Sequence, residues 1–290
     1  MPPAARRFRH GCGTPASGAR AYRRRVTDAL AERALTVPTA LRPWITGIES
    51  VGVGEELPAS FAQVPDTATK LVVRVEAGGR RDTLVIGPRT RASYHADADR
   101  RAASCVQVSL GPGTVRPLLG TAAVDLVGRA VPLGELPAGT ARRLSRELAE
   151  LPPEEMLAYL ADRLPDPTAA DRSRTRLLRA AVDALSTRSG HAPAQVKEVA
   201  RELAVSERQL RNLFTQGVGL SPKHYARIDR VRHVLTEAPR TDWAELAAAT
   251  GYYDQSHMTA DFRTLMGVPP RSYFTGRLPA AQPCRAFRRA

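Results

Sequence analysis

The sequence predicts an α+β chain of several domains, with a small β-rich N-terminal domain, a helical connector and an all-α C-terminal domain. Three observations predict this fold class. Short β-branched runs occupy the first half, apolar residues at helical spacing occupy the second half, and one residue pattern occurs twice near the C-terminus. A length of 290 residues is ample for about two such domains.

Composition excludes several classes of protein. The chain has no run of about eighteen apolar residues, so we expect no membrane span and no membrane partner. The Arg-rich first residues lack the apolar segment of a secretory signal. Cys12, Cys105 and Cys284 lie far apart, which fits a reducing compartment and argues against a disulfide scaffold. We therefore expect a cytoplasmic protein.

The positive charge of the chain is concentrated at its ends. The net charge is +14, yet residues 1–25 and 277–290 contain arginines and no acidic residue. We predict disordered basic tails at 1–26 and 277–290. Such tails could attract phosphates unspecifically, but a solvated tail or a misplaced start codon explains the first one equally well.

Strand-like runs define the β-rich domain, which we place at residues 35–136. Residues 70–76 and 82–87 are joined by Gly78-Gly79, which is a hairpin signal. Residues 104–110 alternate apolar and polar side chains. Short strands at this spacing predict a small barrel or sandwich rather than a parallel sheet.

Helical spacing replaces this alternation after Pro137. Leucines three and four residues apart, interrupted by prolines, predict a helical connector over 137–171. Almost everything that follows has the same helical spacing, and we predict an all-α domain over 172–276.

An internal repeat lies within this last domain. The pattern Phe-x4-Gly-x2-Pro-x2-Tyr begins at Phe214 and occurs again 48 positions later at Phe262. Upstream, Ala200 matches Ala247 after a shift of 47, so the second copy has one extra residue in its turn. Chance matches hardly explain so many residues in register.

Each copy has the residue pattern of a helix-turn-helix. Ser206 with Gln209 predicts a capping box at the start of one second helix, and Asp254 predicts an N-cap at the start of the other. Arginine and asparagine on an outward face suit the edges of guanine and adenine. A helical bundle with two similar hairpins is the alternative. The outward faces carry the residues that we predict to bind DNA: Arg208, Arg211, Asn212, Gln255, Ser256 and His257.

A helix between the two copies sets their predicted separation. Residues 222–236 would form a connector of about 22 Å. The two recognition helices could then lie about one duplex turn apart and enter successive major grooves. Arg227 on this connector is a predicted phosphate contact.

These residues resemble the AraC/XylS family of bacterial transcription regulators. The resemblance rests on the stretches Val199–Phe214, Gly251–Arg263 and Gly267–Tyr273. It implies a domain of seven helices that contacts bases mainly through its third and sixth helices. Ala260 departs from the family pattern, because many relatives have an arginine there that reaches a base or phosphate, and Asp261 beside it is acidic. We therefore expect the second motif to discriminate sequence less than the first.

The N-terminal half resembles, more weakly, the β-rich sensor that precedes some AraC-type domains. The matching pieces are Leu41-Arg-Pro-Trp44, Ile86-Gly87 leading to Thr90, and Val108–Gly113. The resemblance implies a barrel of cupin-like form that senses a small-molecule effector or holds a partner. RNA polymerase is a candidate partner of the whole chain.

The sequence therefore predicts a regulator that binds promoter or operator DNA, and not an enzyme. Histidine spacing indicates no metal site, and we expect no cofactor and no catalytic residue. One alternative is an enzymatic N-terminal domain tethered to a DNA-binding module, and another is an adaptor that binds RNA or protein. Tyr94-His95 could line a pocket, although we expect a surface loop there.

Overall fold

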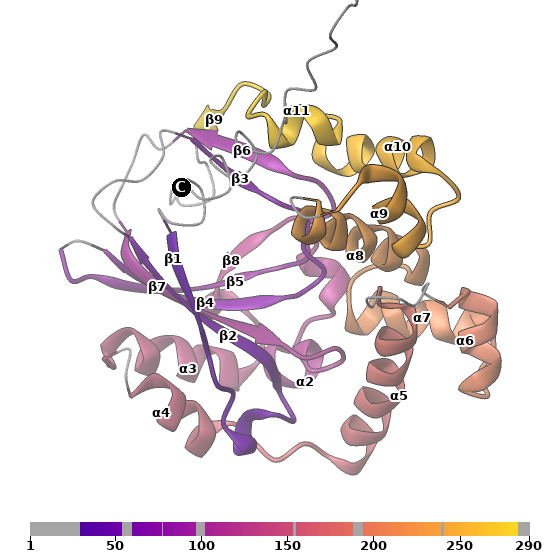
Figure 1. Ribbon diagram of the computed structural model, residues 1–290. Helices are drawn as coiled ribbons and strands as arrows, with labels where there is room; N and C mark the ends of the chain where they lie inside the picture. Colours follow the sequence, from indigo (N-terminus) through magenta and orange to yellow (C-terminus); the bar gives the residue numbers. More distant parts are fainter. Residues whose placement is uncertain are drawn as a thin grey trace, which may run out of the picture.

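The protein is described by a computed structural model that covers residues 30–53, 60–76, 78–96, 102–152, 155–187, 194–238 and 241–283. A six-stranded antiparallel sheet occupies the N-terminal half (Figure 1). In spatial order its strands are β1 (Leu30–Leu35), β2 (Ile45–Val53), β7 (Ala102–Leu110), β4 (Lys70–Glu76), β5 (Arg81–Ile86) and β8 (Ala130–Pro132). The predicted hairpin is β4 and β5, in which Val73 lies opposite Thr83.

The sheet is open among the described residues, because its edge strands β1 and β8 do not pair with each other. The β-rich N-terminal half is confirmed, whereas the strands show no closed, cupin-like barrel. Helices pack on the apolar side of this six-stranded sheet. In this core Val85 and Val108 are fully buried together with residues of the following helical segments.

In the described residues, four short helical segments and two longer helices accompany this sheet and connect it to the rest of the chain. They are η1 (Thr39–Leu41), α2 (Val115–Leu119), η2 (Ala123–Leu126), η3 (Leu133–Glu135), α3 (Gly139–Glu150) and α4 (Met156–Arg163), before α5 (Ala169–Leu185) begins the C-terminal half. The predicted connector is helical, but α3 and α4 do more than connect. Leu144 and Leu148, four residues apart on one face of α3, are buried in the same core as the sheet, and so is Leu160 of α4.

The C-terminal half consists of α5 followed by six further helices. These are α6 (Val196–Glu202), α7 (Glu207–Gly217), α8 (Pro222–Glu237), α9 (Trp243–Ala249), α10 (Gln255–Met266) and α11 (Pro270–Phe274). A second apolar core unites them, with Phe214, Ile228 and Phe262 fully buried. Within the described ranges, no helix is both long and apolar enough to cross a bilayer.

A small second sheet joins the C-terminal end of the described residues to the N-terminal half. It contains β3 (Ser60–Gln63), β6 (Ser93–Ala96) and β9 (Gln282–Pro283), and β9 runs parallel to β6. The basic tail predicted from residue 277 is therefore structured as far as Pro283, because its backbone pairs with β6. The tail predicted at 1–26 and residues 284–290 lie outside the described residues.

The surface loop expected at Tyr94-His95 is strand β6 instead. Tyr94 is buried, with 9% of its surface exposed, and it faces the C-terminal half. The sequence of β6 is too short to show a strand periodicity, and its pairing partners lie far away in the chain.

Candidate nucleic-acid interface

The first helix of each repeat ends in the same hydrogen-bonded turn. After α6 the amide of Val205 donates to the Ala200 carbonyl at 3.0 Å, and after α9 the amide of Tyr252 donates to the Ala247 carbonyl at 3.0 Å. In both turns the preceding residue has a positive φ, 51° at Ala204 and 72° at Gly251. This is the Schellman motif, in which a left-handed residue closes the helix end.

Both recognition helices begin at the predicted N-caps. The Ser206 hydroxyl accepts a hydrogen bond from the Gln209 amide at 3.1 Å, and the Gln209 side chain accepts one from the Ser206 amide at 2.8 Å. The Asp254 carboxylate accepts from the His257 amide at 2.7 Å. The turn covers residues 203–206 in the first copy and 250–254 in the second, which confirms the one-residue insertion.

The second part of the repeat also has the same geometry twice. Phe214 meets Tyr225 edge-on with ring centroids 5.7 Å apart, and Phe262 meets Tyr273 in the same way at 5.9 Å. A proline begins the helix that follows in each copy, α8 and α11, where its missing N–H is not needed. The duplication is therefore structural, and not only a similarity of residue types.

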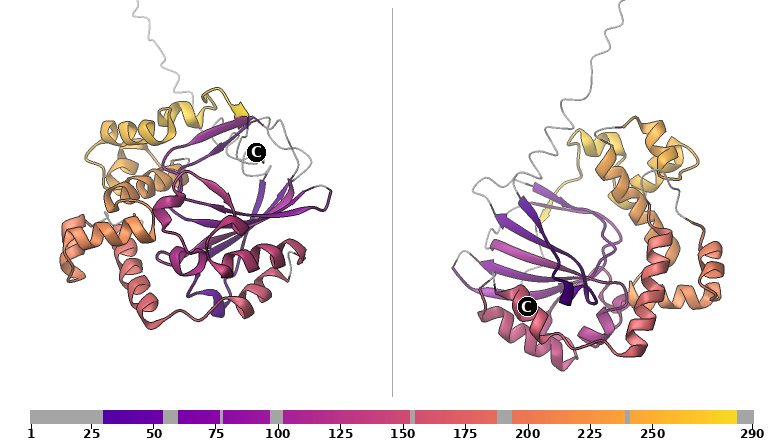
Figure 2. Two further views of the ribbon diagram at one scale, coloured as in Figure 1. Left: turned by 180° about the vertical axis from the view of Figure 1, so that it is seen from behind. Right: turned by 60° about the horizontal axis from the view of Figure 1, so that its bottom comes forward.

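All six predicted DNA-binding side chains are exposed. On α7 they are Arg208, Arg211 and Asn212, and on α10 they are Gln255, Ser256 and His257. Figures 1 and 2 show α7 and α10 on either side of α8. None of the six is packed into the protein interior, so each is accessible to a ligand.

Two of these side chains already have protein neighbours. Arg211 forms an ion pair with Glu207 at 2.8 Å, one turn earlier on α7. The His257 ring lies edge-on to the Tyr252 ring, with centroids 5.3 Å apart. A phosphate or base edge that binds Arg211 would therefore have to compete with an exposed carboxylate, which is a small cost at a solvent-exposed pair.

Arg227, for which the sequence predicts a phosphate contact, is paired within the protein. Its Nε and Nη2 donate to Asp261 Oδ1 at 3.0 and 2.8 Å, while Arg230 lies 3.6 Å from the other carboxylate oxygen. Asp261 is only 7% exposed on α10, so it needs cationic partners inside the protein. Asp261, the acidic residue that we noted beside Ala260, therefore connects α10 to α8.

Tyr253 is a candidate site residue that the sequence analysis did not name. It directly precedes the Asp254 cap of α10, and 93% of its surface is exposed. An aromatic ring in solvent beside a predicted recognition helix can pack on sugars or thymine methyl groups. Its position directly before the predicted N-cap could have indicated that it lies beside the second recognition helix.

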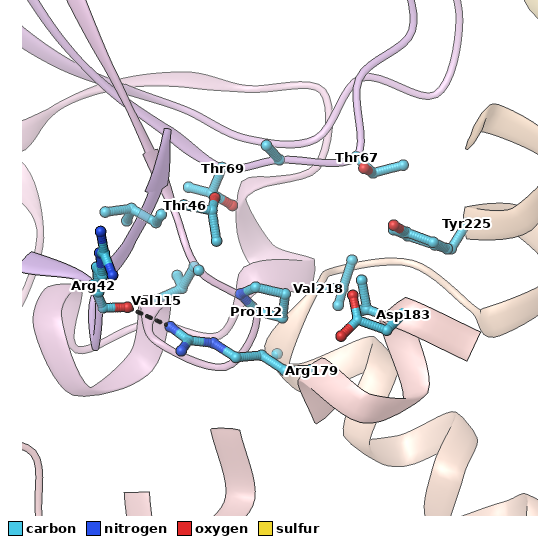
Figure 3. Close-up of a pocket in the computed structure, with 15 residues that line it drawn as sticks. Arg42, Thr46, Thr67, Thr69, Pro112, Val115, Arg179, Asp183, Val218 and Tyr225 are labelled. Atoms are coloured by element: carbon cyan, nitrogen blue, oxygen red, sulfur yellow. Dashed lines mark hydrogen bonds between the residues drawn. The ribbon is translucent and has the colours of Figure 1, made fainter. Parts of the chain in front are cut away.

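A cavity of about 360 Å³ lies where the two halves meet. Figure 3 shows Arg179 extending from α5 toward the backbone of Arg42, with Asp183 and Tyr225 on the opposite side. Arg179 Nη2 donates to the carbonyls of Arg42 and Pro43 at 3.0 and 2.8 Å. Burial, together with the nearby Asp229 charge, raises the pKa of Tyr225 to about 12, so its hydroxyl stays protonated. The described residues contain no cluster of three or more metal-ligating side chains.

Comparison with known proteins identifies the C-terminal region. Residues 199–276 match a family described as "Helix-turn-helix domain". The transcriptional regulator GbdR of Pseudomonas aeruginosa, described as HTH-type, is 32% identical over 94 residues, which are 31% of this chain and 25% of GbdR. The C-terminal region is an AraC-type helix-turn-helix domain. The chain thus matches about a quarter of the length of this relative.

The chain is also similar to solved structures. The match to the C-terminal domain of AraT, a response regulator from Geobacillus stearothermophilus, covers 36% of this chain and 88% of the AraT chain, at 24% identity and a TM-score of 0.33. The match to ToxT from Vibrio cholerae covers 78% of this chain and 96% of the ToxT chain, at 10% identity and a TM-score of 0.35. In the AraC-type domain here, α7 and α10 are the third and sixth of the helices α5–α11, the positions implied by the family resemblance.

Proposed function

We propose that the chain is a cytoplasmic bacterial transcription regulator that binds promoter or operator DNA through its AraC-type domain. The observation that carries the proposal is the duplicated, capped recognition helix with exposed polar side chains. Helix N-termini and cationic side chains hold phosphates, while α7 and α10 enter successive major grooves about one duplex turn apart. The chain performs no catalysis of its own in this proposal.

The N-terminal half is proposed to regulate the DNA-binding half. In this division residues 35–136 sense, 137–171 connect and 172–276 bind DNA. The junction cavity is the site proposed for a small-molecule effector, because guanidinium groups, hydroxyls and apolar side chains line it together. RNA polymerase is a further partner in this scheme.

The roles of the six exposed side chains are part of this proposal. On α7, Arg208, Arg211 and Asn212 contact base edges, with arginine favouring guanine and asparagine favouring adenine. On α10, Gln255, Ser256 and His257 lie over the second groove and discriminate less. Tyr253 adds an apolar contact at the start of α10.

Substitution of the α7 arginines tests this function. Arg208→Ala and Arg211→Ala should each weaken binding to a selected duplex by about 1–3 kcal/mol and relax its sequence preference. The duplex would come from in vitro selection with the wild-type chain, and binding would be measured by fluorescence anisotropy. Arg143→Ala on α3 is a matched control, because that arginine is equally exposed but lies in the N-terminal half. Wild-type affinity in both α7 variants would refute the role of this helix.

Comparing DNA with RNA separates the proposal from the adaptor alternative. A DNA-binding regulator should prefer its selected duplex over RNA of the same sequence, and its affinity should fall steeply with salt. Equal binding to both would favour an RNA-binding adaptor.

A further inference from the structure

The two recognition helices end against the N-terminal half of the molecule. At the end of α7, the Gly217 carbonyl accepts a hydrogen bond from the Gly113 amide at 3.0 Å. At the end of α10, the Leu265 carbonyl accepts one from the Ala92 amide at 2.7 Å. The last carbonyls of a helix have no donor within the helix, so each of these contacts supplies a cap from the other half.

Tyr94 provides a second cap at the end of α10. Its hydroxyl donates to the Met266 carbonyl at 2.6 Å, although the two residues lie 172 positions apart in the chain. The ring is buried on β6, and Figure 1 shows β6 beside the C-terminal helices. Because the Tyr94 side chain is buried on a strand, its hydroxyl is held in one orientation toward the end of α10.

The backbone of α7 approaches the N-terminal half closely at Gly217. A Cβ at Gly217 would lie 2.4 Å from Leu178 Cδ2 and 3.2 Å from Gly113 Cα. The same end of α7 packs against η2 of the N-terminal half. The backbone of α7 therefore rests directly on the loop that begins at the end of β7.

The helix between the two motifs is held as well. On α8, Arg232 Nη1 donates to the Pro65 carbonyl at 3.0 Å and lies 3.6 Å from the carboxylate of Asp66. Asp66 is 6% exposed, and Lys70 lies 3.1 Å from it. The N-terminal half thus contacts the ends of α7 and α10 and the helix that connects the two motifs.

We propose that the N-terminal half sets the separation and relative orientation of the two recognition helices, and so determines which spacing of half-sites the chain accepts. Tyr94 is a positioning residue in this mechanism, because it acts on DNA only through α10. The inference rests on the proposed DNA-binding function. It differs from a design in which α8 alone fixes the separation, because it makes spacing depend on residues outside the DNA-binding domain.

The substitution Tyr94→Phe in the full chain tests the proposal, because it removes one hydroxyl and keeps the ring. Wild type and variant would each select duplexes from a random pool, and the spacing between the two enriched half-sites would be compared. We expect one dominant spacing for the wild type and a broader distribution for the variant. On duplexes with one inserted base pair, the loss of affinity should be roughly two- to tenfold smaller for the variant, which is the effect of one buried hydrogen bond. An unchanged spacing preference would overturn the proposal.

Tyr159→Phe is the matched control. Tyr159 is also partly buried in the N-terminal half, but its hydroxyl has no hydrogen-bond partner in the described part of the chain. This variant should keep the wild-type spacing preference. Thermal unfolding of both variants would show that a change in spacing does not reflect loss of the fold.

A distance measurement without DNA separates failure of this inference from failure of the proposed function. Spin labels at the exposed positions Gln216 on α7 and Arg263 on α10 would report the helix separation by pulsed electron resonance. The native cysteines would first be replaced by serine. A narrow wild-type distribution that broadens in Tyr94→Phe would support the inference even if the wild type selected no bipartite DNA site. Identical distributions would refute it whatever the DNA result.

Discussion

Ala204 shows at the scale of one residue how the two repeats differ. It has a φ of 51° at the position where the second copy has Gly251, with a φ of 72°. The left-handed conformation costs a residue with a Cβ about 1–2 kcal/mol. The first turn is therefore the more strained of the two.

Exchanging these two residues gives opposite expected effects on stability. Ala204→Gly should raise the free energy of unfolding by about 1 kcal/mol, or somewhat less because glycine also gains freedom in the unfolded chain. Gly251→Ala should lower it by a similar amount. Urea denaturation followed by circular dichroism would measure both. A destabilising effect of Ala204→Gly would mean that its methyl group contributes packing that outweighs the strain.

Arg227 has a structural role that predicts a different outcome from that of a phosphate contact. Removing its guanidinium leaves the buried Asp261 carboxylate with Arg230 alone, at 3.6 Å. Hydrogen bonds to a charged group are worth about 1.5–3 kcal/mol, so Arg227→Ala should destabilise the fold by about that much. Calorimetry without DNA would detect the loss. A variant with unchanged stability but weaker DNA binding would restore the phosphate role.

Asp66 makes the contact between the two halves sensitive to acid. Burial disfavours its charged form, but Arg232 and Lys70 outweigh burial, and the pKa of Asp66 lies below its usual value. The stability contributed by such a depressed pKa is present above the unfolded pKa, near 4, and is lost as the pH falls through the folded pKa. The free energy of unfolding of the Asp66→Asn variant should therefore decrease less below about pH 4 than that of the wild type. Urea midpoints measured across the acid range would test this, and parallel curves would contradict it.

At the scale of elements, sequence patterns predicted the helices better than the sheets. Ser206, Gln209 and Asp254 mark helix starts through contacts within three residues, so these caps can be recognised in the sequence. The pairing of β9 with β6 and the burial of α3 and α4 on the sheet depend on partners far away in the chain. No local pattern contains that information.

The capping box of α7 gives a prediction for this element. Ser206→Ala removes the hydroxyl that accepts from the Gln209 amide, and should cost about 1 kcal/mol of stability. Ser206→Asp should retain most of it, because Asp254 performs the same role in the second copy. Thermal melts of the two variants would test this, and equal melting temperatures would contradict it.

At the scale of the whole molecule, two cores are joined by polar contacts. The sheet core and the helical core are separate clusters, and Arg179, Arg232 and Tyr94 bridge them. The exposure of the six candidate DNA-binding residues could be predicted from the sequence, because it depends on local helix faces. The bridging residues could not be predicted, because each bridge pairs one side chain with a backbone carbonyl of the other half.

Weakening these bridges should separate the unfolding of the two halves. We expect one calorimetric transition for the wild type, and two for the double variant Arg179→Ala, Arg232→Ala, because each half keeps its own apolar core. Differential scanning calorimetry would distinguish the two cases. A single transition in the double variant would mean that the apolar contacts alone couple the cores.

The place of β9 has a practical consequence for handling the protein. Its two residues extend the same small sheet that carries Tyr94, and they lie just before residues 284–290. Truncation after Gly276 would therefore remove a strand that pairs with β6, the strand that supports the end of α10 through Tyr94.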